Sequence, residues 1–112
     1  MSVVEQTARA HIVTDEEDPG AVSVVLRYDP DIDPRSVRVG LPGPHEWTFS
    51  RALLERGLRV PAESGDVRVW PCGRVQAVVE FHSAQGVEVV QFESKALLRF
   101  LRRTYTAKPV RT

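Results

Sequence analysis

Apolar and polar residues alternate one by one in several short runs along this chain, and turn-forming residues separate the runs. Such alternation places successive side chains on opposite faces of an extended backbone, as in a half-buried β-strand. The runs begin at Val4, Val22, Val37, Trp47, Val67, Val75 and Val87. Between them lie turn signals such as Pro19-Gly20, Asp29-Pro30, Asp33-Pro34, Pro42-Gly43-Pro44 and Ser83-Ala84-Gln85-Gly86. Because strands joined by short turns usually pair with their neighbours, the pattern predicts antiparallel β-structure.

Two helices are predicted, each opening at a serine that follows an alternating run. Ser50 can cap a short helix over residues 51–57 by accepting a hydrogen bond from a first-turn amide. Gly57 is expected to end this helix in the left-handed conformation. Residues 62–65 are expected to form a loop, and Pro71 is expected to end the strand that begins at Val67. Ser94 is expected to cap a longer helix over residues 95–105. The apolar stripe of the longer helix is predicted to comprise Leu97, Leu98, Leu101 and Tyr105.

The two helix starts resemble each other. Ser50-Arg-Ala-Leu-Leu54 matches Ser94-Lys-Ala-Leu-Leu98, and each segment follows a set of alternating runs. This match indicates a strand meander followed by a helix, occurring twice. The predicted fold is therefore α+β, with two antiparallel β-sheets packed steeply across each other and the helices at their ends.

Length and composition favour one small domain. A chain of 112 residues, with 42% hydrophobic and 27% charged residues, can bury one ordinary core. We expect a single domain over residues 1–106 and a flexible tail over residues 107–112. No apolar run is long enough to span a bilayer, and the N-terminus lacks a signal pattern. The lone Cys72 fits a reducing compartment, so a cytoplasmic location is expected.

The net charge of zero hides an uneven distribution. Acids dominate residues 1–33, whereas every charged residue from Ser94 onward is basic: Lys95, Arg99, Arg102, Arg103, Lys108 and Arg111. These cations could form a basic face for an acidic partner or nucleic acid. We favour the alternative of a solvated helix face and a frayed tail, because cations near a helix C-terminus are favoured by its dipole.

No residue pattern in the chain is typical of catalysis. The three histidines, His11, His45 and His82, show no metal-ligand spacing to one another or to Cys72. The chain is therefore expected to be no enzyme and to need no cofactor or metal.

Arg68 and Trp70 project from the strand face opposite Val67 and Val69. An exposed arginine beside tryptophan is typical of a recognition surface. A covered pair would belong to the fold core or to an oligomer interface, and we favour burial.

Several motifs occur in order along most of the chain. They are Leu26-Arg-Tyr-Asp29, Asp33-Pro34, Val37, then Trp47, Phe49, Arg51, Leu53, Leu54, Gly57, Leu58, Pro61 and Gly65-Asp-Val-Arg-Val-Trp-Pro71, then Phe100-Leu101, Arg103 and Thr104. In these positions the chain resembles the SsgA-like family of actinomycete sporulation and cell-division proteins. The Gly65 to Pro71 segment is the most specific part of the resemblance.

The resemblance implies a fold similar to the whirly type of single-stranded nucleic-acid binders, assembled as a homotrimer. It also implies a non-catalytic, oligomeric cytoplasmic adaptor that is recruited to the division septum. Such an adaptor would act in septum-site selection, in recruitment or activation of FtsZ-type division machinery, or in cell-wall remodelling. The alternative is a whirly-like single-stranded nucleic-acid-binding protein, which the zero net charge disfavours.

Most residues of the block at 47–71 have an expected structural role, so few of them remain for binding. The partner-binding candidates are Arg51, Asp66, Arg68 and one face of Trp70. The basic face of Lys95, Arg99, Arg102 and Arg103 is a second candidate surface.

Overall fold

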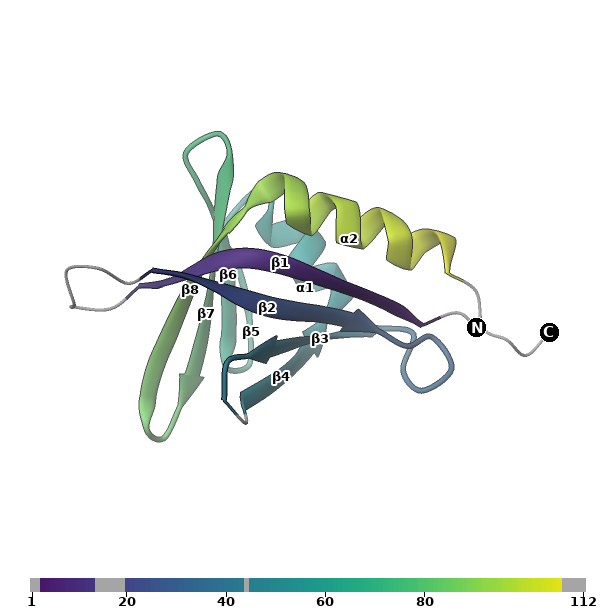
Figure 1. Cartoon of the computed structure of the whole chain (residues 1–112), viewed down its shortest axis with the longest axis horizontal. Helices are drawn as coiled ribbons and strands as arrows, with labels where there is room; N and C mark the ends of the chain where they lie inside the picture. The colour runs from purple at the N-terminus through teal and green to yellow at the C-terminus, as the bar shows by residue number, and fades with distance from the viewer. Residues whose placement is uncertain (1–2, 14–19, 44, 108–112) are drawn as a thin grey trace.

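A computed structural model describes residues 3–13, 20–43 and 45–107 of the chain. Eight strands and two helices follow one another in these residues (Figure 1). They are β1 (Val4–Val13), β2 (Ala21–Tyr28), β3 (Ser36–Leu41), β4 (His45–Ser50), α1 (Arg51–Gly57), β5 (Ala62–Ser64), β6 (Val67–Cys72), β7 (Gln76–Ser83), β8 (Gly86–Glu93) and α2 (Ser94–Thr106). Four strands and a helix thus occur twice in succession, as the matching helix starts indicated. None of the helices in the described part of the chain is long and apolar enough to cross a membrane.

All eight strands belong to one antiparallel sheet, in the order β4-β3-β2-β1-β8-β7-β6-β5. The prediction of two separate sheets is therefore wrong. The two four-strand meanders are joined because β1 pairs with β2 along most of its length and with β8 from Ala10 to Val13. A long strand that pairs on both sides keeps the ladder continuous, and the strong twist of the sheet then brings its two halves face to face.

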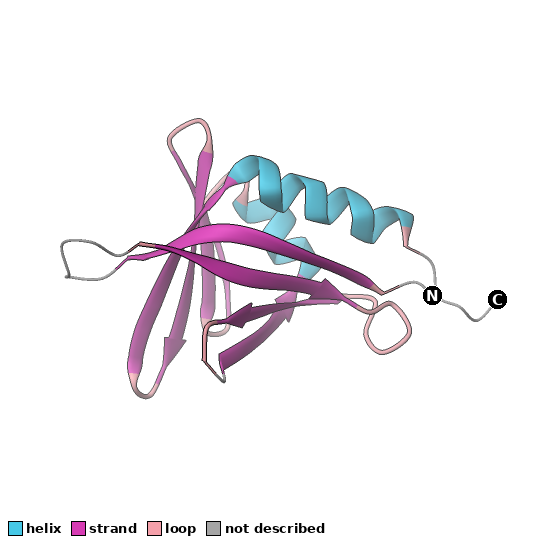
Figure 2. Cartoon of the chain, in the orientation of Figure 1, coloured by secondary structure: helices cyan, strands magenta, loops and turns pink. Residues whose placement is uncertain are grey.

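The sheet is strongly curled (Figure 2), and its two halves meet through aromatic side chains. Trp47 of β4 stacks on Phe81 of β7 with 4.9 Å between the ring centroids, and Phe49 lies tilted against the same ring at 5.9 Å. Phe81 is fully buried, as are Leu26, Val69 and Val90 on other strands of the sheet. Burial of these side chains, at roughly 1.5–3 kcal/mol each, is the main stabilising contribution.

Helix α2 lies outside the sheet beside β1 and closes one side of the core (Figure 1). Its buried residues are Leu97, Phe100, Leu101 and Thr104, which recur at the i, i+3, i+4, i+7 spacing of one helix face. The predicted apolar stripe is correct for Leu97 and Leu101 but wrong for its other two residues, because Leu98 is 43% exposed and Tyr105 is 53% exposed. The polar Thr104 tolerates burial because its hydroxyl donates a hydrogen bond to the carbonyl of Leu101.

The two helix starts differ from each other in their capping. The hydroxyl of Ser50 accepts a hydrogen bond from the backbone amide of Leu53, which confirms the predicted cap of α1. Ser94 is the first helical residue of α2, and the capping residue Glu93 makes no side-chain capping bond. The amide of Ser94 instead donates to the carbonyl of Val75, since a backbone partner is available there. The helix consequently runs from 94 to 106 and not from 95 to 105.

Three further predictions, all for residues 57–72, are wrong. Residues 62–64, expected to be loop, form the edge strand β5, and β6 continues through Pro71 to Cys72. Proline is tolerated near the end of a strand where its missing amide costs little. Gly57 is the last residue of α1 and is not among the residues with positive φ.

Gly57 is required by close packing. A Cβ atom on residue 57 would lie 2.3 Å from the Cβ of Val69, so α1 can approach β6 only with glycine there.

Replacing Gly57 by alanine is expected to force α1 away from β6. The free energy of unfolding should fall by about 3 kcal/mol, measured by urea denaturation. Gly40→Ala is the matched control, because a Cβ at residue 40 would meet its nearest neighbour at 3.7 Å. That variant should change the free energy of unfolding by less than about 0.5 kcal/mol. Equal effects of the two substitutions would contradict the packing argument.

Candidate functional site

Arg51 lies at the junction of the two helices and the sheet. Its guanidinium group sits between two aromatic rings, 5.2 Å from the centroid of Tyr28 and 4.2 Å from that of Tyr105. One guanidinium nitrogen donates to the Tyr28 hydroxyl at 3.3 Å and to the carbonyl of Thr104 at 3.4 Å. Arg51 is thus engaged within the molecule through both cation–π contacts and hydrogen bonds.

The residues around Arg51 are themselves fixed by further bonds. The Tyr28 hydroxyl donates to the carbonyl of Pro34 at 2.9 Å, and the Tyr105 hydroxyl donates to the carboxylate of Glu55. We call Tyr28, Arg51, Glu55, Thr104 and Tyr105 the Arg51 cluster. It joins β2, α1 and the last turn of α2, which are far apart in the sequence.

The hydrogen bond to Glu55 also affects the acidity of Tyr105. Because a carboxylate acceptor stabilises the protonated hydroxyl, it raises the pKa of Tyr105 above its ordinary value of 10.0. Partial burial raises this pKa further, and the charge of Arg51 opposes the shift.

Arg68 and Trp70 lie next to each other on the outer face of β6. The guanidinium carbon of Arg68 is 5.5 Å from the centroid of the Trp70 ring. Arg68 is exposed and Trp70 is half-buried, so the expected burial of this pair does not occur within the chain. The inner face of β6 is filled by Val67 and Val69, which leaves Arg68 and Trp70 on the side away from the core.

Asp66 is exposed in the turn between β5 and β6, where its backbone carbonyl accepts a hydrogen bond from the amide of His82. No bond or ring contact between described residues joins Asp66 or Arg51 to the Arg68–Trp70 pair. The four candidates predicted for partner binding therefore occupy separate places: the Arg51 cluster, one turn and one strand face.

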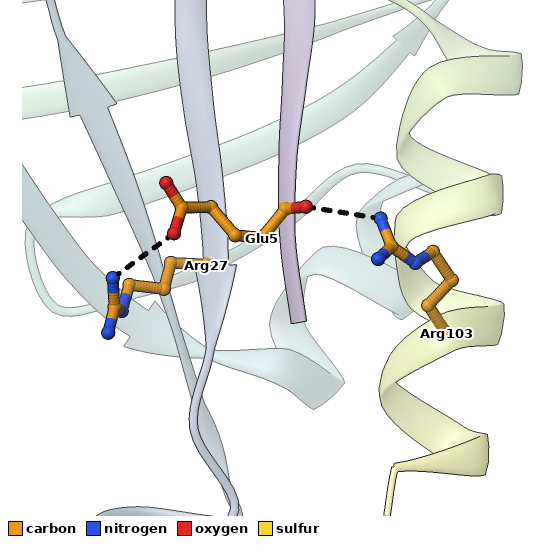
Figure 3. Close-up of polar contacts among 3 residues, drawn as sticks. All are labelled: Glu5, Arg27 and Arg103. Carbon is orange, nitrogen blue, oxygen red and sulfur yellow. Dashed lines mark hydrogen bonds and ion pairs between the residues drawn. The ribbon is translucent and has the colours of Figure 1, made fainter. Parts of the chain in front are cut away.

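The basic face of α2 divides into two parts. Arg103 reaches back to β1 and donates to the backbone carbonyl of Glu5 at 3.2 Å and to the side-chain oxygen of Gln6 at 3.5 Å. The carboxylate of Glu5 points the other way and pairs with Arg27 at 3.3 Å, as Figure 3 shows. The other cations of the face, Lys95, Arg99 and Arg102, are exposed and make no such contact among the described residues.

Sequence reasoning missed most of the Arg51 cluster. Tyr28 belongs to the alternating run from Val22 and to the Leu26–Asp29 motif, with no expected binding role, and Tyr105 was expected in the apolar stripe of the longer helix. Nothing local in the sequence signals their common contact with Arg51, because they come from three separate elements.

The described residues include no group of three histidine, cysteine, aspartate or glutamate side chains arranged to hold a metal ion. Cys72 is exposed. A hollow of about 460 Å³ between α1 and β5 is lined by Ser50, Ala52, Leu53, Arg56, Pro61, Ala62, Glu63 and Ser64. Its charged residues are a single arginine and a single glutamate.

Arg51→Ala should loosen the joint between the helices and β2. We expect the free energy of unfolding to fall by about 2 kcal/mol, since two ring contacts and two hydrogen bonds are lost. Arg56→Ala, on the exposed side of the same helix, should change it by less than about 0.5 kcal/mol. Comparable losses in both variants would show that the Arg51 contacts do not stabilise the fold.

The raised pKa of Tyr105 predicts a stability change in alkaline solution. A group whose folded-state pKa is raised contributes stability that is complete below the unfolded pKa, which for tyrosine is about 10. This contribution is lost as the pH rises through the higher pKa of the folded state. Thermal unfolding of the native chain should therefore lose more stability above pH about 10 than unfolding of Tyr105→Phe. Parallel pH profiles for the two proteins would contradict the assignment.

Comparison with known proteins gives a consistent result. Residues 22–112 match a family described as Streptomyces sporulation and cell division protein, SsgA. The sporulation-specific cell division protein SsgB of Frankia casuarinae is 39% identical over 100 residues, covering 82% of this chain and 68% of that protein. SsgB of Streptomyces coelicolor is 36% identical over 105 residues, covering 88% and 76% of the two chains.

Solved structures share the same fold. A structure from a study of SsgB mutations that correlate to longitudinal cell division during sporulation of Streptomyces coelicolor superimposes with a TM-score of 0.84 and 35% identity. The match covers 96% of this chain and 88% of the other. An SsgA-like sporulation-specific cell division protein from Thermobifida fusca matches with a TM-score of 0.83 and 28% identity, over 97% and 84% of the two chains. This chain therefore belongs to the SsgA family of sporulation and cell-division proteins.

Proposed function

We propose that this chain is a non-catalytic, oligomeric adaptor in sporulation-specific cell division. It acts in septum-site selection, in the recruitment or activation of FtsZ-type division machinery, or in cell-wall remodelling. The observation that carries the proposal is the similarity of the chain to SsgB of Streptomyces coelicolor, whose name is sporulation-specific cell division protein. That similarity extends over 88% of this chain and 76% of that protein.

The outer face of β6 is the surface that best suits a protein partner. Arginine and tryptophan are enriched at the energetic centres of protein interfaces, and here they lie side by side and accessible to solvent. Asp66 lies in the turn that precedes this strand and extends the same candidate surface towards β5. Arg51 contributes indirectly, because its cluster holds α1 and α2 in place.

An oligomer, which we propose to be a homotrimer, would cover apolar side chains on the outer side of the sheet. Val13 and Val87 are 50% and 51% exposed, and Val13 lies directly opposite the partly exposed Val89 in the β1–β8 ladder. Apolar side chains that cluster on a sheet face are a common element of subunit interfaces. We place the oligomer in the cytoplasm, recruited to the division septum.

The alternative function, whirly-like binding of single-stranded nucleic acid, requires aromatic rings close to clustered cations. Phe100 lies between the cations of α2 but is fully buried. Tyr105 is the exposed aromatic residue of α2, and its ring already packs against Arg51 while its hydroxyl bonds to Glu55. We therefore favour the adaptor function.

The adaptor function predicts direct binding to a division protein. Purified chain should bind a purified FtsZ-type GTPase, and Arg68→Glu should weaken that binding by about tenfold or more in a titration. Arg74→Glu is the matched control, because Arg74 is also exposed and lies outside the Arg68–Trp70 pair. In sporulating cells a fluorescent fusion should co-localise with septal rings.

Several results would contradict this assignment. Diffuse fluorescence of the fusion protein, together with normal septation in cells that lack the protein, would contradict the role in division. If Arg68→Glu and Arg74→Glu weaken binding equally, the outer face of β6 is not the contact surface. A monomeric mass by light scattering would contradict the proposed oligomer. The contact with the partner would then still be tested by the titration.

A further inference from the structure

Helix α2 carries a stripe of cations on the side that faces away from the core. Lys95, Arg99 and Arg102 follow one another at spacings of four and three residues, which places them on one helix face. All three are exposed, and α2 contains no acidic residue. Arg103 does not belong to the stripe because it is bound to β1.

An apolar residue lies within these cations. Leu98 is 43% exposed, and it is three residues after Lys95 and four before Arg102. We call Lys95, Leu98, Arg99 and Arg102 the α2 stripe. The acids next to the helix do not neutralise it: Glu5 pairs with Arg27, and Glu55 is bonded to Tyr105. Glu93, immediately before the helix, is exposed and has no such partner among the described residues.

We propose that the α2 stripe is a contact surface for an anionic lipid bilayer. Cations on an exposed helix are attracted to the negative surface potential of anionic headgroups, and an apolar residue among them can enter the boundary between headgroups and acyl chains. The proposal concerns the membrane at which the chain would act, and it does not depend on the division partner proposed above.

The shape of the surface favours a membrane over a protein segment. Peptides are usually bound in a groove or along a free strand edge. The stripe is instead the outward side of α2, the helix that closes one side of the core and lies at the edge of the molecule (Figure 2). A flat anionic surface can meet all three cations of such a ridge at once.

The chemistry of the stripe also favours lipid over nucleic acid. Single-stranded nucleic acid is held by stacking of bases on free aromatic rings in addition to charge. The stripe offers an aliphatic side chain in that place, and the nearby Tyr105 ring is already covered on one side by Arg51.

Sedimentation with lipid vesicles tests the proposal. The full chain should co-sediment with vesicles of equimolar phosphatidylglycerol and phosphatidylcholine at low salt, about 50 mM, and much less at about 500 mM. It should not co-sediment with pure phosphatidylcholine. The triple variant K95Q/R99Q/R102Q should lose about tenfold or more of the binding to anionic vesicles. Leu98→Ser should reduce binding by a smaller factor.

The control variant is R9Q/R59Q/R74Q, which removes the same charge from exposed arginines on other parts of the molecule. It should keep binding within about twofold of the native chain. Unfolding curves should show that both triple variants fold, because all six positions are exposed.

Three outcomes would overturn the proposal. They are no binding of the native chain to anionic vesicles at low salt, an equal loss in both triple variants, and tighter binding to a labelled oligothymidylate than to the vesicles. A failure here leaves the titration with the FtsZ-type GTPase unaffected, so the two proposals are judged separately.

Discussion

The hydrogen bonding of β1 is the constraint on which the rest of the architecture depends. Residues 10–13 pair with β8, while most of the strand pairs with β2, so β1 joins the two meanders into one sheet. Nearer its start, β1 has no strand on the β8 side, because β8 has already turned into α2. The helix takes the place of the missing strand: Arg103 donates to the backbone carbonyl of Glu5 (Figure 3), and the side-chain amide of Gln6 donates to the carbonyl of Ala96. The Arg103 bond gives one backbone carbonyl of β1 a partner, while burial of Leu97, Phe100 and Leu101 holds α2 against the core.

The position of α2 in turn determines which polar residues are free to act. Its last turn brings Thr104 and Tyr105 to Arg51, and this contact uses an arginine that would otherwise have been a candidate for binding. Arg103 is used in the same way at β1. The surfaces that remain are the Arg68–Trp70 pair on β6 and the cationic outer side of α2. Both function proposals rest on residues that the fold itself does not need.

The strands of this chain were largely predictable, whereas the exceptions have identifiable causes. Residues 62–64 are too few to show an alternation, and their pairing with β6 arises from the turn at Gly65. The buried stripe of α2 was predicted wrongly because leucine and tyrosine are usual core residues, yet Leu98 and Tyr105 are exposed while Thr104 is buried. A threonine whose hydroxyl bonds within its own helix can replace them. Gly57 was identified as important, but for contact with Val69 and not for a left-handed conformation.

The sequence by itself determined the elements and the family: where strands alternate, where Ser50 opens a helix, and which motifs resemble the SsgA-like proteins. These are local properties, because alternation, capping and motif order are contained in neighbouring residues. Only the tertiary structure decided that the two meanders form one sheet, how α2 is rotated, and which arginines are engaged. Those outcomes depend on contacts between β1, α1 and α2, whose residues lie far apart in the chain, so no single segment of the sequence could indicate them.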